Sequence, residues 1–165
     1  KEIVPLGLED VDATTKTGIN LSPEAWREFI QREDVVLIDN RNSFEYEIGH
    51  FKKAIDPGVQ HFRKFAEYIE ENLPHWEGKD IAMYCTGGIR CEKTTAWLAD
   101  KGLQVYQLEG GILNYFMQIP DAKNDYEGSC FVFDDRRALD TQLNEVAIKP
   151  EDISEKSRHR LTPLE

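Results

Sequence analysis

The sequence predicts an α/β fold in which a mainly parallel β-sheet is flanked by helices, and three observations support this prediction. Short apolar segments typical of buried strands lie at residues 35–38, 81–84 and 104–108. Segments with apolar residues at helical spacing separate them, and this alternation is typical of parallel sheets joined by crossover helices. The glycine-containing loop 85–90 directly follows the second of these strands. Such folds bind ligands at the carboxyl ends of their strands, so this loop is the first candidate site.

The first helix is marked by its start signals. Ser22 is suited to the N-cap position and Pro23 to the first helical position. Trp26 shares one face of this helix with other apolar residues, and we expect it in the core. The β-branched segment 35–38 then predicts a buried strand that ends at Asp39.

The later elements follow from the same kinds of signal. We expect helices where apolar residues recur at helical spacing, and strands where short apolar runs stand between turn residues. In chain order these are a helix at 43–48 closed by Gly49, a brief strand at 54–55, a helix at 62–73 ended by Pro74, a strand at 81–84, a helix at 91–101 capped by Gly102, a strand at 104–108, a helix at 112–117 and a strand at 130–133.

Length and composition limit the chain to one domain with extensions. The chain has 165 residues, of which 40% are hydrophobic, and this supports one good core. We expect an N-terminal arm or linker at residues 1–19, following a further domain that this sequence lacks. The main domain is expected at 20–120 and a C-terminal extension at 121–165. The polar segment from residue 149 onward is expected to be weakly ordered.

Cysteine content and charge restrict the environment and the partners. The three cysteines are an odd number without a secretory framework, which favours a reducing compartment, so we expect a cytoplasmic protein. No segment approaches the roughly 18 apolar residues of a membrane span, and we expect no membrane contact. The net charge of -11 argues against a protein that coats nucleic acid by charge alone, although a local basic rim remains compatible with it.

The loop that begins at Cys85 has the composition of a reactive-thiolate site. Gly87 and Gly88 let the backbone curl so that successive N–H groups point to one spot. The dipole of the following helix and the charge of Arg90 are expected to lower the thiol pKa below its free value of about 8.5. The alternative is a buried structural cysteine. The glycine pair and the arginine favour the reactive interpretation.

Several short motifs are spread over residues 20–120. They are Leu37-Ile38-Asp39-Asn40-Arg41, Glu45, Gly49-His50-Phe51, Ala54-Ile55, Cys85-Thr86-Gly87-Gly88-Ile89-Arg90 and Leu108-Glu109-Gly110-Gly111-Ile112. Together they resemble a rhodanese domain. The resemblance implies an α/β fold whose central, mainly parallel sheet has helices on both faces, with short terminal extensions. It implies that Cys85 is the nucleophile and carries sulfur as a persulfide. It further implies that an anion-binding loop is lined by Thr86, Gly87, Gly88, Ile89 and Arg90.

The resemblance also separates supporting from reacting residues. Asp39 and Arg41 match the family's Asp-x-Arg motif, which we interpret as structural support. His50 is interpreted as satisfying local backbone groups and not as a general base. Phosphatases related to this fold have one residue more between cysteine and arginine. The four residues between Cys85 and Arg90 form a tighter loop suited to sulfur, so the phosphatase remains a minor alternative.

A closer resemblance is carried by residues 85–93, 110–115 and 128–136 and by the opening residues 1–8. These segments look like the bacterial rhodanese-domain tRNA uridine hydroxylases. The resemblance implies an oxidoreductase of tRNA modification that uses dioxygen as co-substrate to convert the wobble uridine to 5-hydroxyuridine, with the tRNA anticodon loop as partner. We identify no cofactor and no metal. At 154–159 serine stands at both positions where the family has Cys-x-x-Cys-Arg-His, which argues against zinc there.

Other readings of the function and of three residues stay open. A generic thiosulfate or persulfide sulfurtransferase would need only Cys85 and its loop, and a noncatalytic rhodanese module is the remaining alternative. Cys91, at the expected start of a helix where a thiol pKa can be lowered, either resolves a persulfide on Cys85 or packs as a small residue. Tyr115 and Phe116 either stack on a base or pack in the core.

Overall fold

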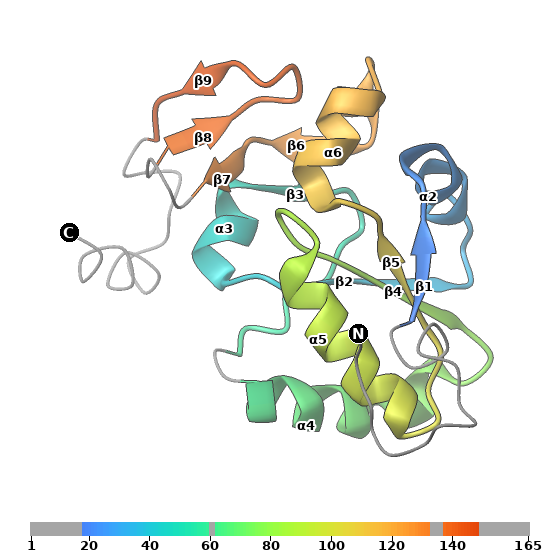
Figure 1. Cartoon of the computed structure of the whole chain (residues 1–165). Helices are drawn as coiled ribbons and strands as arrows, with labels where there is room; N and C mark the ends of the chain where they lie inside the picture. The colour runs from blue at the N-terminus through green and yellow to red at the C-terminus, as the bar shows by residue number, and fades with distance from the viewer. Residues whose placement is uncertain (1–17, 60–61, 133–136, 149–165) are drawn as a thin grey trace.

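A central parallel sheet organises the protein, which we describe from a computed structural model covering residues 18–59, 62–132 and 137–148. Its four strands are β1 (Ile19–Leu21), β2 (Val35–Asp39), β4 (Asp80–Tyr84) and β5 (Val105–Leu108), in the order β1-β5-β4-β2 (Figure 1). All three pairings are parallel. The predicted α/β fold is therefore confirmed.

Helices cover both faces of this sheet. Along β4, Ile81 and Met83 belong to one buried cluster, and Ala82 and Tyr84 belong to the other. The first cluster is closed by α4 (Phe62–Asn72) and α5 (Ile89–Asp100), and the second by α2 (Pro23–Phe29) and α6 (Gly111–Gln118). Because successive strand side chains point to opposite faces, an apolar strand of this kind requires cover on both. Trp26 is fully buried, as predicted.

The predicted starts and ends of the helices agree closely with the structure. The Ala25 N–H donates a hydrogen bond to Ser22 Oγ at 3.2 Å, and Pro23 begins α2, as predicted. The helix predicted at 62–73 ends at Asn72, and Pro74 lies in the short 3₁₀ segment η1 (Leu73–Trp76). Residues 54–55 form only an isolated bridge between Ile55 and Ile38. The strand predicted at 104–108 begins one residue later.

Strand β1 was not predicted, because three residues are too few to show a strand pattern. It lies at the sheet edge beside β5 and begins one residue before the expected boundary at residue 20. Helix α5 begins at Ile89, two residues before the start predicted from its sequence. The reason is Gly88, whose φ of 94° places it at the N-cap and turns the chain directly into the helix.

The segment after residue 120 packs against the domain and adds two small sheets. After η2 (Ala122–Asn124), β6 (Tyr126–Gly128) pairs antiparallel with β3 (Gly49–Phe51). Strands β7 (Cys130–Val132), β8 (Arg137–Leu139) and β9 (Glu145–Val146) form an antiparallel sheet. The predicted strand at 130–133 is thus present at least to Val132, and Phe133 lies outside the described residues. The Phe131 ring contacts Phe44 of α3 (Ser43–Ile48), with centroids 5.1 Å apart.

Among the described helices, none combines the length and the apolar composition that a membrane span needs. The predicted polar tail from residue 149 lies outside the described residues, and so do the serines at 154 and 157.

Candidate functional site

Strand β4 places Cys85 at the carboxyl edge of the sheet. Cys85 directly follows Tyr84, the last residue of β4, and its residue is 1% exposed. The Gly88 N–H donates a hydrogen bond to the Cys85 sulfur at 3.1 Å. An N–H that points at sulfur stabilises an anion on it, so this contact favours the thiolate form.

The loop turns two of its carbonyl groups toward α6. The Cys85 carbonyl accepts a hydrogen bond from the Ile112 N–H at 3.0 Å, and the Thr86 carbonyl accepts one from the Leu113 N–H at 3.2 Å. In a planar trans peptide the C=O and the N–H point in opposite directions. The N–H groups of Thr86 and Gly87 therefore point to the side of the loop opposite α6. Helix α6 thus fixes the orientation of these two loop peptides.

Gly111 is required for this contact, and a substitution there is a direct test. A Cβ at Gly111 would lie 2.4 Å from the Thr86 carbonyl oxygen, and the residue has a φ of +71°. We expect Gly111→Ala to displace the loop and to lower the free energy of unfolding by more than the roughly 1–2 kcal/mol that left-handed strain alone costs. Urea unfolding at equilibrium measures the difference.

Gly102→Ala is the matched control. Gly102 has a φ of +88°, but nothing lies within 4 Å of its Cβ position. It therefore carries the backbone strain without the collision, and we expect the smaller loss. Equal losses in the two variants would show that the contact between Gly111 and the loop is unimportant.

The structure describes the other predicted loop residues only in part. Thr86 and Gly87 follow Cys85 before the helix, and Ile89 and Arg90 form the first turn of α5. The side chains of Ile89 and Arg90 lie outside the described residues. The expected charge of Arg90 beside the sulfur therefore stays a prediction.

Cys91, in the first turns of α5, interacts with Cys85. It is 1% exposed, its side chain shares a hydrogen bond with Cys85, and the Asn40 side-chain amide contacts its sulfur at 3.8 Å. Burial first, and then the neighbouring Cys85, raise the pKa of the Cys91 thiol well above its ordinary value. The expectation of a lowered pKa for Cys91 was wrong, because it considered the helix start and not the burial.

Asp39 and Arg41 form a buried ion pair at the end of β2. Arg41 donates two hydrogen bonds to the two Asp39 carboxylate oxygens, at 2.9 and 2.7 Å, and both side chains are 0% exposed. Arg41 also donates to the Gly49 carbonyl, and the Tyr84 hydroxyl donates to Asp39 at 2.8 Å. The pair therefore ties β2, β3 and β4 together directly below Cys85, a position that fits structural support.

Sequence reasoning left Glu45 out of the site. Its carboxylate is 0% exposed and accepts hydrogen bonds from the Asn42 N–H at 3.2 Å and from the Thr86 hydroxyl at 3.5 Å. The spacing of Asn42 and Glu45 is that of a capping box, which is the signal that could have drawn attention to it. Glu45 thus connects the start of α3 to the Cys85 loop.

Cys130 of the C-terminal segment also reaches the loop. It is fully buried and its side chain interacts with Thr86, while burial raises the pKa of its thiol to about 11. The sequence could not show this neighbour, because 44 residues separate the two along the chain.

Two aromatic candidates and one histidine have core or local partners. Tyr115 and Phe116 are 0% and 4% exposed and pack in the core, so they do not present a stacking surface for a base. The Tyr115 hydroxyl donates to Asp125 at 2.7 Å. His50 stacks on Tyr46 and its Nδ1 contacts the Phe51 carbonyl at 2.9 Å, as a local role requires.

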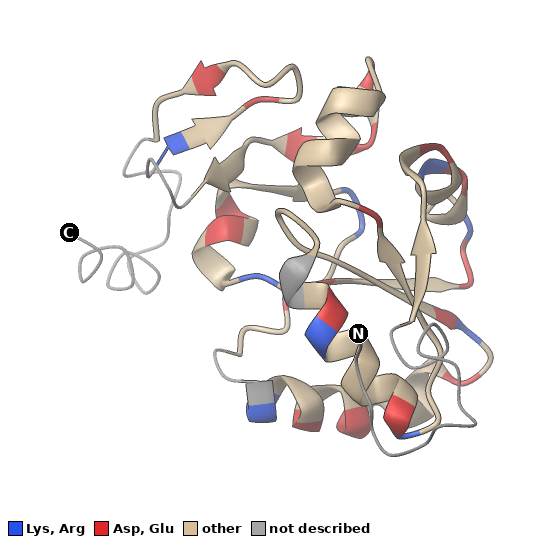
Figure 2. Cartoon of the chain, viewed as in Figure 1, with Lys and Arg blue, Asp and Glu red and all other residues tan. Residues whose placement is uncertain are grey.

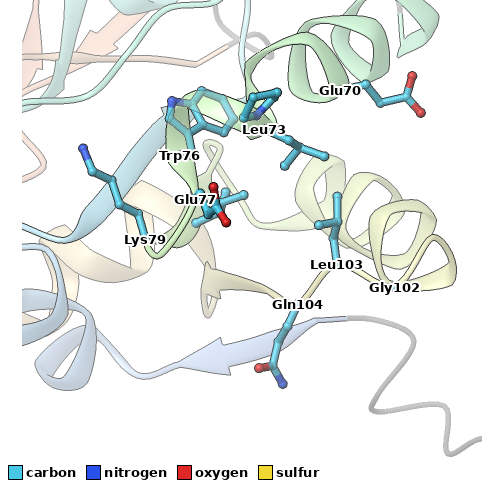
Figure 3. Close-up of a pocket in the computed structure, with 10 residues that line it drawn as sticks. Glu70, Leu73, Trp76, Glu77, Lys79, Gly102, Leu103 and Gln104 are labelled. Carbon is cyan, nitrogen blue, oxygen red and sulfur yellow. The ribbon is translucent and has the colours of Figure 1, made fainter.

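A separate pocket lies at the end of β4 opposite to Cys85. Figure 3 shows it between η1, the end of α4 and the turn that precedes β5, with Trp76, Leu103 and Lys79 among its walls. Its lining includes Ile81, near the start of β4, whereas Cys85 follows the end of that strand. None of the predicted site residues lines this pocket.

Comparisons with known proteins identify relatives of this chain. A family model described as a rhodanese-like domain matches residues 22–118. Two curated proteins named tRNA uridine(34) hydroxylase, from Legionella pneumophila strains Paris and Corby, are 54% and 53% identical to the chain over 147 residues. The match covers 88% of this chain and 58% of each relative, so the chain spans little more than half the length of these proteins.

A solved structure is similar in fold. The rhodanese-like domain of an Anabaena protein superimposes with a TM-score of 0.52 at 18% identity, over 66% of this chain and 78% of that one.

Proposed function

The chain belongs to the family of rhodanese-like domains, and from this premise we propose that it is the catalytic part of a tRNA uridine hydroxylase. The observation that carries the proposal is the identity of 54% over 147 residues to a protein named tRNA uridine(34) hydroxylase. The proposed reaction replaces the hydrogen on carbon 5 of the wobble uridine by a hydroxyl group whose oxygen atom comes from dioxygen, and a two-electron reductant supplied from outside this chain would convert the other oxygen atom to water. The product is 5-hydroxyuridine in tRNA.

In this proposal Cys85 is the essential group, as a thiolate or as a persulfide. The Gly88 N–H already points at its sulfur, and α6 holds the loop carbonyls on the other side. The loop amides and Arg90 would hold the anion next to the base. An anticodon base is single-stranded, so an extruded uridine can reach a loop pocket without melting a duplex.

The charge distribution bears on the direction in which tRNA would approach. Figure 2 shows acidic residues on α3 and α4, faces that phosphates would avoid. At the start of α5, after the Cys85 loop, the exposed Lys93 carries a positive charge next to the exposed Glu92. We propose that the anticodon loop enters over the start of α5, and that further affinity comes from parts of the full-length protein beyond this chain.

The test is nucleoside mass spectrometry of total tRNA. A strain that lacks the gene, and any other gene for uridine 5-hydroxylation, should contain no 5-hydroxyuridine or derivative of it. The full-length protein supplied on a plasmid should restore the modification. An unchanged nucleoside profile after restoration would refute the proposal.

A sulfurtransferase is the second candidate, and the loop length favours it over a phosphatase. Four residues separate Cys85 from Arg90, and the Gly88 N–H contacts sulfur directly. Thiocyanate formation from thiosulfate and cyanide by the purified protein tests this reading. Rapid thiocyanate formation, together with an unchanged nucleoside profile of tRNA, would favour a sulfurtransferase over a hydroxylase.

A further inference from the structure

Two of the three buried cysteines share a hydrogen bond. Cys85 leaves the end of β4 and Cys91 lies in the first turns of α5, and the side chains of the two residues interact. Both residues are 1% exposed. The left-handed Gly88 brings them together, because it reverses the chain within the loop and starts the helix at once. A sulfur in hydrogen-bond contact with the nucleophile is placed for sulfur chemistry.

The surroundings of Cys91 hold its side chain in place. The Asn40 side-chain amide contacts the Cys91 sulfur at 3.8 Å and donates to the Thr94 hydroxyl at 3.1 Å. The Asn40 N–H in turn donates to the Tyr84 carbonyl, next to Cys85. Asn40 therefore keeps Cys91 at the end of β4, where the nucleophile is.

We propose that Cys91 is a second catalytic thiol, which resolves a persulfide on Cys85 by forming a Cys85–Cys91 disulfide. The Cys91 sulfur, after losing its proton, attacks the Cys85 sulfur and a new S–S bond forms. The bond between the Cys85 sulfur and the outer sulfur breaks, and the outer sulfur leaves with the electron pair as hydrosulfide. The outer sulfur is reduced and the Cys91 sulfur is oxidised, while the Cys85 sulfur keeps its oxidation state, so no external oxidant is needed.

The disulfide is a reversible resting state of the site. Thiol–disulfide exchange with a dithiol reductant opens it and returns both thiols. In the unloaded site Cys91 stays protonated, since burial and the adjacent Cys85 both oppose its ionisation. In a persulfide the negative charge lies on the outer sulfur, one atom further from Cys91. Cys85 therefore opposes the ionisation of Cys91 less strongly. The proposal rests on the proposed function only in that Cys85 carries sulfur.

Intact mass spectrometry under non-reducing conditions tests the proposal. The reduced, desalted full-length protein is treated with inorganic polysulfide, and released sulfide is measured in parallel. In wild type we expect the mass to fall by two hydrogens while sulfide appears, and peptide mapping should place the disulfide between Cys85 and Cys91. Cys91→Ser should instead stay one sulfur atom heavier than the untreated protein.

Cys130→Ser is the matched control, because Cys130 is an equally buried thiol that interacts with Thr86. It should behave as wild type. Cys91→Ala, with thermal unfolding of each variant, provides a second substitution should serine disturb the packing. A wild-type protein that keeps its persulfide as Cys91→Ser does, that pairs Cys85 with Cys130, or that takes up no sulfur would overturn the inference. These readouts contain no tRNA, so they fail independently of the hydroxylation assay.

Discussion

A full-length protein with Cys85→Ser is expected to leave tRNA without 5-hydroxyuridine, at the level of a strain that lacks the gene. Serine keeps nearly the same volume at this 1% exposed position. Its hydroxyl, however, forms neither a thiolate nor a persulfide at neutral pH. The Gly88 N–H would then contact a neutral oxygen instead of a sulfur anion. The measurement is nucleoside mass spectrometry of total tRNA from the complemented strain.

The folding control for this variant is its thermal unfolding midpoint, which should stay close to that of wild type. If 5-hydroxyuridine persists in the Cys85→Ser strain, Cys85 is not the reacting group and the proposed chemistry is wrong. If the modification disappears only because the protein unfolds, the unfolding midpoint reveals it.

Breaking the buried ion pair below the site is expected to have the largest effect on stability. Burial opposes the charge of Arg41, and the Asp39 carboxylate more than offsets this, so that the pKa of Arg41 is well above its ordinary value. Asp39→Asn keeps the shape but removes the compensating charge. Removing one partner of a buried pair costs about 3–5 kcal/mol, and we expect that loss in the free energy of unfolding. Equilibrium unfolding in urea measures it.

Asp34→Asn is an unusually close control. Arg32 contacts Asp34 with two hydrogen bonds at 2.9 and 2.7 Å and the same spacing of two residues, but both side chains are exposed. Water and salt screen this pair, so its loss should hardly change stability. Similar effects of the two substitutions would show that burial does not decide the strength of the Asp39–Arg41 pair.

Most of the fold could be predicted from local sequence signals. Ser22 and Pro23 mark the start of α2, and the apolar segments correspond to β2, β4 and β5. The elements that the sequence did not predict correctly also have local explanations. Strand β1 is too short for a pattern, and Gly88 starts α5 earlier than the apolar residues indicate.

The candidate site, too, could be predicted only in part from the sequence. The Cys85 loop was visible in the sequence because glycines and an arginine gather within a few residues. Glu45, Asn40 and Cys130 were not assigned to the site, since each reaches the loop from another element. Contacts between distant segments leave no periodic signal in the chain.

The sequence by itself determined the class of fold, the family and the candidate cysteine, because strand composition, caps and a glycine loop are local properties. Only the tertiary structure decided how that cysteine is surrounded. It brought α6 against the loop carbonyls, buried Glu45 beside Thr86, and placed Cys91, the pKa of which is raised by burial, against Cys85. The physical reason is that burial and charge depend on which elements meet in space, and packing sets both.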